Sequence, residues 1–238
     1  MTADKDARRE PSIKPSKSRS SSFFSESKTA GTDSRGVPGL RIIPDFLTVE
    51  EEQKVLTYLN SQACSWRTDL SRRTMHFGGT YCLYSRPVKG QNSTPQILEA
   101  PPLPDDLDWL VDRMVGLGVY AEIDQKRPEY VIVNEYLSKM GISAHTENFS
   151  FHSPVVGLSL GSPDVMRFHE LAGAFDGSVR TGKAAKAPKT GRVEDVLLPS
   201  RSLCIMSGES RWSWQHEIRP LKRAATFKRV SLTFRVKK

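Results

Sequence analysis

After residue 129 the sequence breaks into short runs that are rich in β-branched and aromatic side chains. Five such runs, each of four to seven residues, begin at residues 130, 155, 165, 202 and 230, and Gly, Pro, Asn and Ser separate them. Runs of this kind are typical of β-strands. Because no helical pattern of useful length intervenes, we expect mostly antiparallel strands that form a sandwich or jelly roll.

Two helices are expected ahead of these strands. Thr48 is a suitable N-cap, and the acidic residues after it complement the positive end of a helix that runs to about Leu59. Apolar residues recur at helical spacing from Asp105 to about Gly116. The expected fold class is therefore mainly β with flanking helices, within the α+β class.

Charge and low complexity divide the chain further. Residues 1–38 carry eight basic and five acidic side chains and include a serine-rich stretch, so we expect a disordered Ser-rich basic tail. A folded domain should follow at 39–238, with a basic loop insertion at 172–192. The net charge of +8 suggests a polyanionic partner, most simply nucleic acid, and solvated lysines without such a partner are the alternative.

The composition argues against several classes of protein. No apolar run approaches the ~18 residues that a membrane-spanning helix needs, and the charged N-terminus does not resemble a secretory signal, so no membrane association is expected. The three cysteines are far apart, which argues against a disulfide scaffold or a zinc ribbon and fits the cytoplasm or the nucleus. Nothing resembles a coiled coil, and we expect a monomer.

One stretch carries a candidate metal site. His145 and Glu147 are two residues apart, and on a β-strand their side chains would leave the same face. His216 is the natural third ligand, because two histidines and one carboxylate form the facial triad of non-haem iron(II) oxygenases. A surface pair without a metal is the alternative, since the chain contains further histidines.

The last expected strand carries two arginines, Arg229 and Arg235, on one face. An arginine that faces the protein interior needs an anion, and its planar fork suits a carboxylate. A dicarboxylate such as 2-oxoglutarate would satisfy both side chains. Alternatively, one or both arginines point outward together with the neighbouring lysines.

Seven motifs follow one another along the chain: Asn-x-Tyr (134–136), Gly-Ile-x-x-His-x-Glu (141–147), Leu-Ser-Leu-Gly-Ser (158–162), Met-x-Phe (166–168), Leu-Pro-Ser-Arg-Ser-Leu-Cys-Ile-Met-Ser-Gly-Glu-Ser-Arg (198–211), Trp-x-His-x-Ile (214–218) and Arg-x-Ser-Leu-Thr-Phe-Arg (229–235). As an ordered set over residues 40–236 they resemble the AlkB family of Fe(II)/2-oxoglutarate-dependent dioxygenases. Within the family, the sequence of these motifs is most similar to that of the branch that hydroxylates a modified wobble uridine in tRNA. The resemblance implies a double-stranded β-helix (jelly roll) core.

For the metal, the resemblance implies that His145, Glu147 and His216 are the iron ligands and form the catalytic centre. The family carries aspartate where this chain has Glu147. The additional methylene moves the carboxylate by about one C–C bond, or ~1.5 Å. Because metal sites require agreement within ~0.2 Å, the backbone must adjust if this glutamate is to bind iron.

For the cosubstrate, the resemblance implies that Asn134 and Tyr136 hydrogen-bond 2-oxoglutarate. Arg229 would pair with its distal carboxylate, and Arg235 would lie near the carboxylate that is lost. Ser231 stands where an asparagine contacts the cosubstrate in some members. Fe(II) would be the cofactor, with 2-oxoglutarate and O₂ as cosubstrates.

For the substrate, the resemblance implies a nucleotide-recognition segment at Arg72, Arg73, His76 and Phe77, where basic and aromatic side chains hold a flipped base. A Gly-rich turn is the alternative there. The implied reaction hydroxylates or oxidatively demethylates a nucleic-acid base, with tRNA preferred over alkylated DNA or RNA. Two other functions remain open: a catalytically silent AlkB-fold RNA-binding protein in which Glu147 does not hold iron, and an oxygenase that acts on a protein or lipid.

Overall fold

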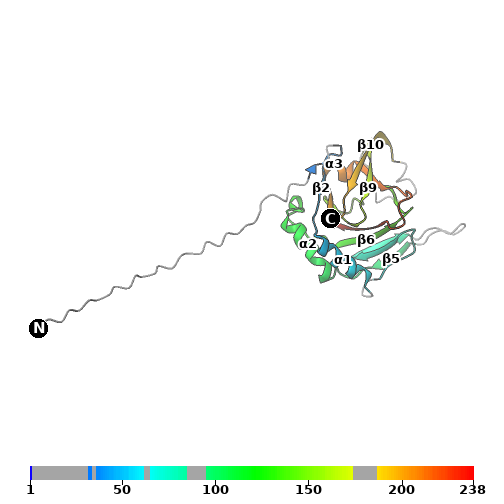
Figure 1. The fold of residues 1–238 in the computed structure, drawn as a ribbon. Helices are drawn as coiled ribbons and strands as arrows, with labels where there is room; N and C mark the ends of the chain where they lie inside the picture. The colour runs from blue at the N-terminus through cyan, green and yellow to red at the C-terminus, as the bar shows by residue number, and fades with distance from the viewer. Residues whose placement is uncertain (2–31, 34–35, 62–64, 85–94, 174–186) are drawn as a thin grey trace.

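The computed structural model of the chain describes residue 1 and residues 32–33, 36–61, 65–84, 95–173 and 187–238. Most of the predicted tail at 1–38 and residues 174–186 of the predicted insertion lie outside the described residues. Within these two regions, the described residues include the short strand β1 and the beginning of strand β10. The prediction of a mainly β chain with flanking helices is confirmed (Figure 1).

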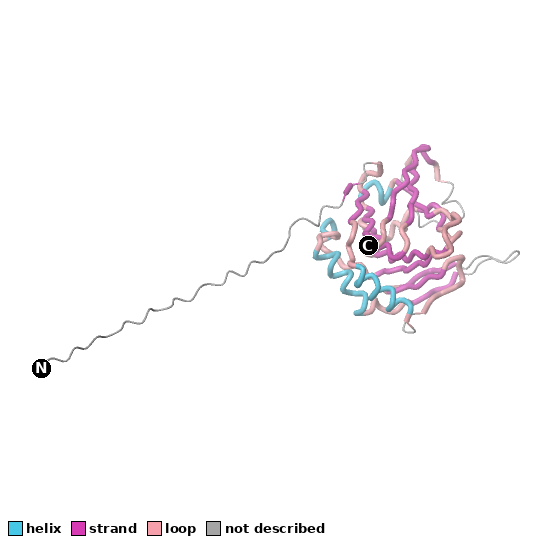
Figure 2. The backbone as a smooth tube through the Cα atoms, viewed as in Figure 1, coloured by secondary structure: helices cyan, strands magenta, loops and turns pink. Residues whose placement is uncertain are grey.

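Two antiparallel sheets form the centre of the molecule (Figure 2). The major sheet has the order β1-β2-β11-β8-β13-β6-β3, with bounds Thr32–Asp33, Leu40–Ile43, Ser202–Met206, Val155–Gly161, Lys228–Arg235, Tyr130–Leu137 and Arg73–Phe77. The minor sheet has the order β10-β9-β12-β7, with bounds Lys189–Leu198, Asp164–Leu171, Trp214–Ile218 and Ile142–His145. A separate pair consists of β4 (Thr80–Tyr84) and β5 (Pro95–Glu99).

Two helices cover the face of the major sheet that is turned away from the minor sheet (Figure 1). Helix α1 (Val49–Asn60) begins as predicted, because the Thr48 side chain accepts a hydrogen bond from the Glu51 amide and the Glu51 side chain accepts one from the Thr48 amide. Helix α2 (Asp105–Gly116) has the predicted bounds. A 3₁₀ turn, η1 (Ala121–Ile123), follows it.

Side chains that alternate along β13 point to the two faces of the major sheet, and the two faces have different roles. One face packs against the helices in a continuous apolar core, to which β13 contributes Val230, Leu232 and Phe234. The opposite face lines a pocket between the two sheets, to which β13 contributes Arg229, Ser231, Thr233 and Arg235. The predicted placement of both arginines on one inward face is therefore observed.

Two local features differ from the expectation. Strand β7 ends at His145, so Glu147 lies in the following loop and not on the same strand as the histidine. A short helix, α3 (Gly208–Trp212), lies between β11 and β12, where no helix is expected. With five residues it is too short to produce a helical periodicity in the sequence.

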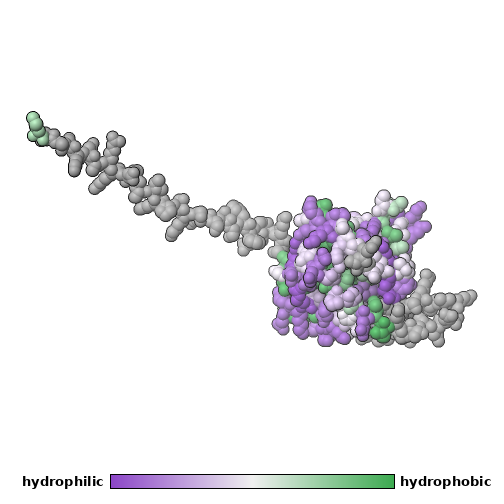
Figure 3. Space-filling view, turned by 90° about the horizontal axis from the view of Figure 1, so that it is seen from below, coloured by the Kyte–Doolittle hydropathy of each residue, from purple (hydrophilic) through white to green (hydrophobic). Residues whose placement is uncertain are grey.

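The surface carries few large apolar side chains. The face seen in Figure 3 is mostly hydrophilic, with isolated hydrophobic residues. Exposed examples include Ile97 on β5 and Leu197 on β10. Among the described residues, no helix combines the length and the apolar character that crossing a membrane requires.

Candidate active site

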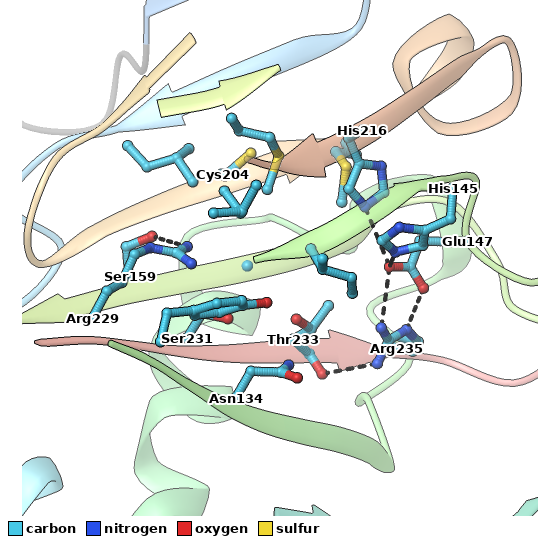
Figure 4. Close-up of a pocket in the computed structure, with 17 residues that line it drawn as sticks. Asn134, His145, Glu147, Ser159, Cys204, His216, Arg229, Ser231, Thr233 and Arg235 are labelled. Carbon is cyan, nitrogen blue, oxygen red and sulfur yellow. Dashed lines mark hydrogen bonds and ion pairs between the residues drawn. The ribbon is translucent and has the colours of Figure 1, made fainter. Parts of the chain in front are cut away.

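A cavity of about 60 Å³ lies between the two sheets and contains two chemically different ends (Figure 4). His145, Glu147 and His216 stand at one end, with Arg235 beside them. Arg229 stands at the other end. We call these the metal end and the anion end.

The metal end brings the three predicted ligands together. His145 on β7 and His216 on β12 are cross-strand partners, and their ring centroids are 4.4 Å apart. Oε1 of Glu147 lies 3.8 Å from Nε2 of His145 and 3.6 Å from Nε2 of His216. One potential ligand atom from each residue lies within 4.8 Å of the others, which fits a single metal ion.

The protonation states at this end also suit a metal ion. Nδ1 of His145 lies 2.8 Å from the Ser143 carbonyl oxygen. Because a carbonyl only accepts, Nδ1 donates this hydrogen bond, and in the neutral ring the lone pair is then on Nε2. Burial, together with the neighbouring His145, lowers the pKa of His216 to about 4, so its ring is neutral at neutral pH.

Glu147 is ionised through its contact with Arg235. Nε of Arg235 donates to Oε2 at 2.6 Å, and Nη2 donates to Oε1 at 3.1 Å. Burial by itself would raise the pKa of Glu147, but the Arg235 charge and the hydrogen bonds outweigh it, and the pKa lies well below its usual range. The carboxylate therefore offers negative charge to a metal ion while it remains paired with arginine.

The anion end contains a buried cation that no carboxylate neutralises within the described part of the chain. Arg229 is only 3% exposed, and burial lowers its pKa. Its Nη2 donates to Oγ of Ser159 at 2.9 Å, whereas its Nε is buried without a hydrogen-bond partner. Its guanidinium also lies 5.3 Å from the centre of the Tyr136 ring. Because an unpaired buried charge is costly, this end fits a ligand carboxylate.

The remaining predicted cosubstrate residues lie between the two ends. Asn134 and Tyr136 face the cavity from β6, and Ser231 of β13 lies opposite Asn134 in the sheet register. Oδ1 of Asn134 accepts a hydrogen bond from Nε of Arg72 at 2.7 Å. Since arginine only donates, this contact leaves the amide NH₂ of Asn134 as its free donor. The structure thus brings all five predicted cosubstrate residues to one cavity.

The four predicted substrate residues do not lie together. Arg72 contacts the cosubstrate residues, and its guanidinium is 5.8 Å from the Tyr136 ring centre. Arg73 instead forms two hydrogen bonds with Glu135 and stacks on Trp66 at 4.2 Å. Phe77 is buried in the apolar core beneath the helices. Because alternate residues of β3 face opposite sides of the sheet, Arg73 and Phe77 point away from the cavity side.

His76 belongs to the opposite face of β3. Its ring lies edge-on to Tyr81, with 4.8 Å between the centroids, and its Nδ1 is buried without a hydrogen-bond partner. Burial lowers the pKa of His76 to about 4, so the ring is neutral at neutral pH. It is not among the residues that line the cavity.

Sequence reasoning missed several residues of the site. Thr233 lines the cavity two positions beyond Ser231, which the alternation along β13 could have indicated. Ser159 holds Arg229 from the neighbouring strand β8, a contact that requires knowledge of the strand order. Arg211 binds main-chain carbonyl groups of the segment that begins at Glu147, and no local pattern in the sequence indicates this.

Together, the two-sheet fold, the His–Glu–His site and the buried arginine opposite it define a 2-oxoglutarate-dependent dioxygenase. Comparison with known proteins extends this assignment. The family described as the 2OG-Fe(II) oxygenase superfamily matches residues 39–235. The "Alkylated DNA repair protein ALKBH8 homolog" of Arabidopsis thaliana is 29% identical over 188 residues, which cover 76% of this chain and 51% of that protein. The chain belongs to the 2OG-Fe(II) oxygenase superfamily and, within it, to the AlkB family.

Two further comparisons define the extent of the similarity. The mouse protein named "tRNA (carboxymethyluridine(34)-5-O)-methyltransferase ALKBH8" is 30% identical over 196 residues, which cover 78% of this chain and 25% of that protein. The chain therefore spans about half the length of the Arabidopsis relative and a quarter of the mouse relative. The solved structure titled "The structure of OsALKBH1" superposes with a TM-score of 0.54 at 17% identity, over 84% of this chain and 98% of that one, and supports the fold.

Proposed function

We propose that this protein is an Fe(II)/2-oxoglutarate-dependent dioxygenase that oxidises a nucleic-acid base, with tRNA as the preferred substrate. The observation that carries the proposal is the arrangement of one cavity, which has a metal-ligand set at one end and an unneutralised buried arginine at the other. A metal ion fits the first end and a carboxylate fits the second. 2-Oxoglutarate can bridge the two ends, because its 2-oxo acid group can chelate a metal ion while its distal carboxylate pairs with Arg229.

Each residue of the site has a distinct task in this proposal. His145, His216 and Glu147 would hold Fe(II), which when bound supplies the activation of O₂ that is coupled to conversion of 2-oxoglutarate to succinate and CO₂. Arg235 keeps Glu147 ionised and oriented. Arg229 binds the distal carboxylate of the cosubstrate. The apolar side chains of Met166, Leu198, Met206 and other residues around the cavity exclude water from the site.

The substrate class rests on charge and on the relatives. The chain has a net charge of +8, as expected for a protein that binds a polyanion. One relative is named for alkylated DNA repair and another for modification of uridine 34 of tRNA. Oxidation of an N-methyl group would release formaldehyde, whereas oxidation of a C5 side chain would leave an alcohol on the base. A nucleic-acid substrate is also consistent with the expected location in the cytoplasm or nucleus.

The first test is anaerobic titration of the protein with Fe(II) in the presence of 2-oxoglutarate. We expect the weak visible charge-transfer band of chelated 2-oxoglutarate, and its loss in His145→Ala and His216→Ala. His169→Ala is the matched control, because His169 is also a histidine of the minor sheet but pairs with Glu217 outside the cavity. Absence of the band in the unmodified protein would contradict the proposed metal and cosubstrate site.

The substrate is tested by succinate release during turnover. We expect tRNA to stimulate succinate formation more than alkylated single-stranded DNA does, and the stimulated rate to disappear in His216→Ala. Mass spectrometry of the tRNA nucleosides would then identify the oxidised base. Equal, unstimulated turnover with every nucleic acid would contradict the substrate class and favour a protein or lipid substrate.

A specific contact favours one alternative function. Both carboxylate oxygens of Glu147 accept hydrogen bonds from Arg235, so the arginine competes with a metal ion for the same atoms. If this pair excludes Fe(II), the protein is a catalytically silent RNA-binding member of the family. The two functions differ in the titration above, since only the oxygenase gives the band, and the silent protein would still bind RNA with a steep dependence on salt.

A further inference from the structure

We propose that Arg211 is a positioning residue that fixes the main chain of Glu147 and ties it to the segment that carries His216. The inference rests on the proposed function only in requiring that the three ligands bind a divalent metal. Arg211 is not among the residues that line the cavity, and four hydrogen bonds of its guanidinium go to main-chain carbonyl oxygens, one of them that of Glu147. Its effect on the site is therefore indirect.

The guanidinium of Arg211 gathers four main-chain carbonyl groups of one loop. Nη1 donates to the carbonyl of Glu147 at 3.0 Å, and Nη2 donates to those of Asn148 at 2.6 Å and Phe151 at 3.1 Å. Nε donates to the carbonyl of His152 at 3.4 Å. The planar guanidinium thus holds the segment from Glu147 to His152 around a single group.

The surroundings of Arg211 keep this fork in place. The side chain is only 1% exposed, and its guanidinium stacks on the ring of Trp212 at 4.0 Å. Arg211 belongs to the last turn of α3, which leads directly into β12 and His216. The same side chain therefore joins the element before one ligand to the loop that holds another.

Glu147 needs such support because it has no strand to hold it. β7 ends at His145, so the sheet ladder fixes the first histidine but not the carboxylate residue. A glutamate also has one rotatable bond more than an aspartate, and a metal site requires its ligands within about 0.2 Å. Arg235 fixes the carboxylate end of Glu147, and Arg211 fixes its main chain. Both ends of the longer side chain are then defined.

Lysine cannot reproduce this arrangement. Arginine has five N–H donors in a rigid plane, whereas lysine has three on a single rotatable nitrogen. Arg211→Lys keeps the charge and most of the stem but cannot span all four carbonyl groups. Arg223→Lys is a matched control, because Arg223 is partly buried, with 12% of its side chain exposed, and likewise donates to several groups: Asp164 and the carbonyls of Arg219 and Leu221.

The test is Co(II) titration of the full chain, followed by the visible absorption of the bound ion. Co(II) binds N and O ligands more tightly than Fe(II) and resists oxidation by air. We expect Arg211→Lys to weaken Co(II) binding by about 10- to 100-fold, the range found when a group that orients a ligand is lost. Arg223→Lys should change it by far less. Unchanged affinity in a folded Arg211→Lys protein would overturn the proposal, as would an equal loss in both variants.

A double-variant comparison separates positioning from general stability. In a Glu147→Ala background there is no carboxylate to position, so adding Arg211→Lys should have little further effect on Co(II) affinity. The same 10- to 100-fold loss in that background would show that Arg211 acts through the fold, and would overturn the proposal. If the unmodified chain binds no Co(II) that depends on His145, the metal site fails, and with it both this inference and the proposed function.

A measurement on the unmodified chain covers the case in which Arg211→Lys does not fold. The proposal requires the segment 147–152 to be ordered before metal arrives. Amide hydrogen exchange of this segment should therefore be slow in the metal-free protein and nearly unchanged by Co(II). Rapid exchange that becomes slow only with Co(II) would mean that the metal, and not Arg211, orders the segment.

Discussion

The two ends of the cavity place the same residue type in opposite situations. Arg229 and Arg235 lie six residues apart on β13, face the same side, and are 3% and 8% exposed. Arg235 is neutralised by Glu147 through two hydrogen bonds. Arg229 has only a serine hydroxyl as a hydrogen-bond partner, and its Nε has none within the described part of the chain.

This difference separates a structural charge from a binding charge. In a buried ion pair each charge neutralises the other, so removing one partner leaves the other without a counter-charge. A buried charge without a partner is satisfied only when a ligand arrives, so removing it relieves the free protein and harms binding. The two arginines should therefore respond to substitution with opposite effects on stability, although sequence alone does not distinguish them.

The largest effect is expected from breaking the pair at the metal end. Glu147→Ala leaves Arg235 buried without its carboxylate, which should lower the free energy of unfolding by about 3–5 kcal/mol. The same change removes a proposed metal ligand and should abolish turnover. Urea unfolding of the metal-free protein measures the first effect. Asp195→Ala is the control, because Asp195 pairs with Arg167 at the solvated surface and its loss should cost far less.

The next effect tests the anion end. Arg229→Met should weaken 2-oxoglutarate binding by about 2–5 kcal/mol, the scale for loss of a desolvated charge partner, or roughly 30-fold and more in affinity. The unfolding free energy of the ligand-free protein should stay the same or rise, because an apolar side chain replaces an unpaired charge. Destabilisation as large as that of Glu147→Ala would show that Arg229 has a structural partner and would remove the contrast between the two ends.

A smaller effect is expected from shortening the carboxylate. Glu147→Asp withdraws the carboxylate by about 1.5 Å, one C–C bond, from an arginine that now lies at 2.6 Å. Because the main chain is held for a glutamate, we expect Co(II) affinity to fall by about tenfold or more. A rise in Co(II) affinity, together with turnover that the unmodified chain lacks, would instead mean that Glu147 prevents the unmodified chain from binding its metal.

The sequence predicts the elements of this fold well and the long-range contacts poorly. The Thr48 cap and the apolar spacing from Asp105 define both long helices, because capping and periodicity are local. Strand periodicity also predicts that the side chains of Arg229 and Arg235 point to the same face of β13. By contrast, the bond from Arg72 to Asn134 joins residues 62 positions apart. Such contacts depend on strand order, which no local pattern contains.

The segment around β3 illustrates the same limit for the site. The resemblance groups its basic and aromatic residues as substrate contacts, but strand alternation sends them to opposite faces of the sheet. Arg73 is held by Glu135 on the helix side, whereas Arg72 precedes the strand and reaches Asn134. The alternation of side chains along a strand would assign successive residues of this segment to opposite faces of the sheet. That assignment, however, requires knowing at which residue β3 begins.

The smallest predicted effect concerns Arg72, whose position suggests that it serves the cosubstrate. Its Nε holds Oδ1 of Asn134, and this contact turns the amide NH₂ of Asn134 toward other acceptors. Arg72→Met should therefore raise the KM for 2-oxoglutarate by roughly two- to twelvefold, equivalent to one hydrogen bond of about 0.5–1.5 kcal/mol.

Measurement of tRNA affinity in the same Arg72→Met variant separates this role from the predicted contact with the substrate. A phosphate contact would weaken tRNA binding and reduce its salt dependence by about one counterion. We expect the KM for 2-oxoglutarate to change and the salt dependence to stay the same. Asn134→Ala provides the matched comparison, because adding Arg72→Met to it should raise the KM no further if arginine acts only through that amide. If tRNA binding weakens with a smaller salt dependence while the KM for 2-oxoglutarate stays the same, Arg72 belongs to the nucleic-acid surface and Arg229 alone serves the anion end.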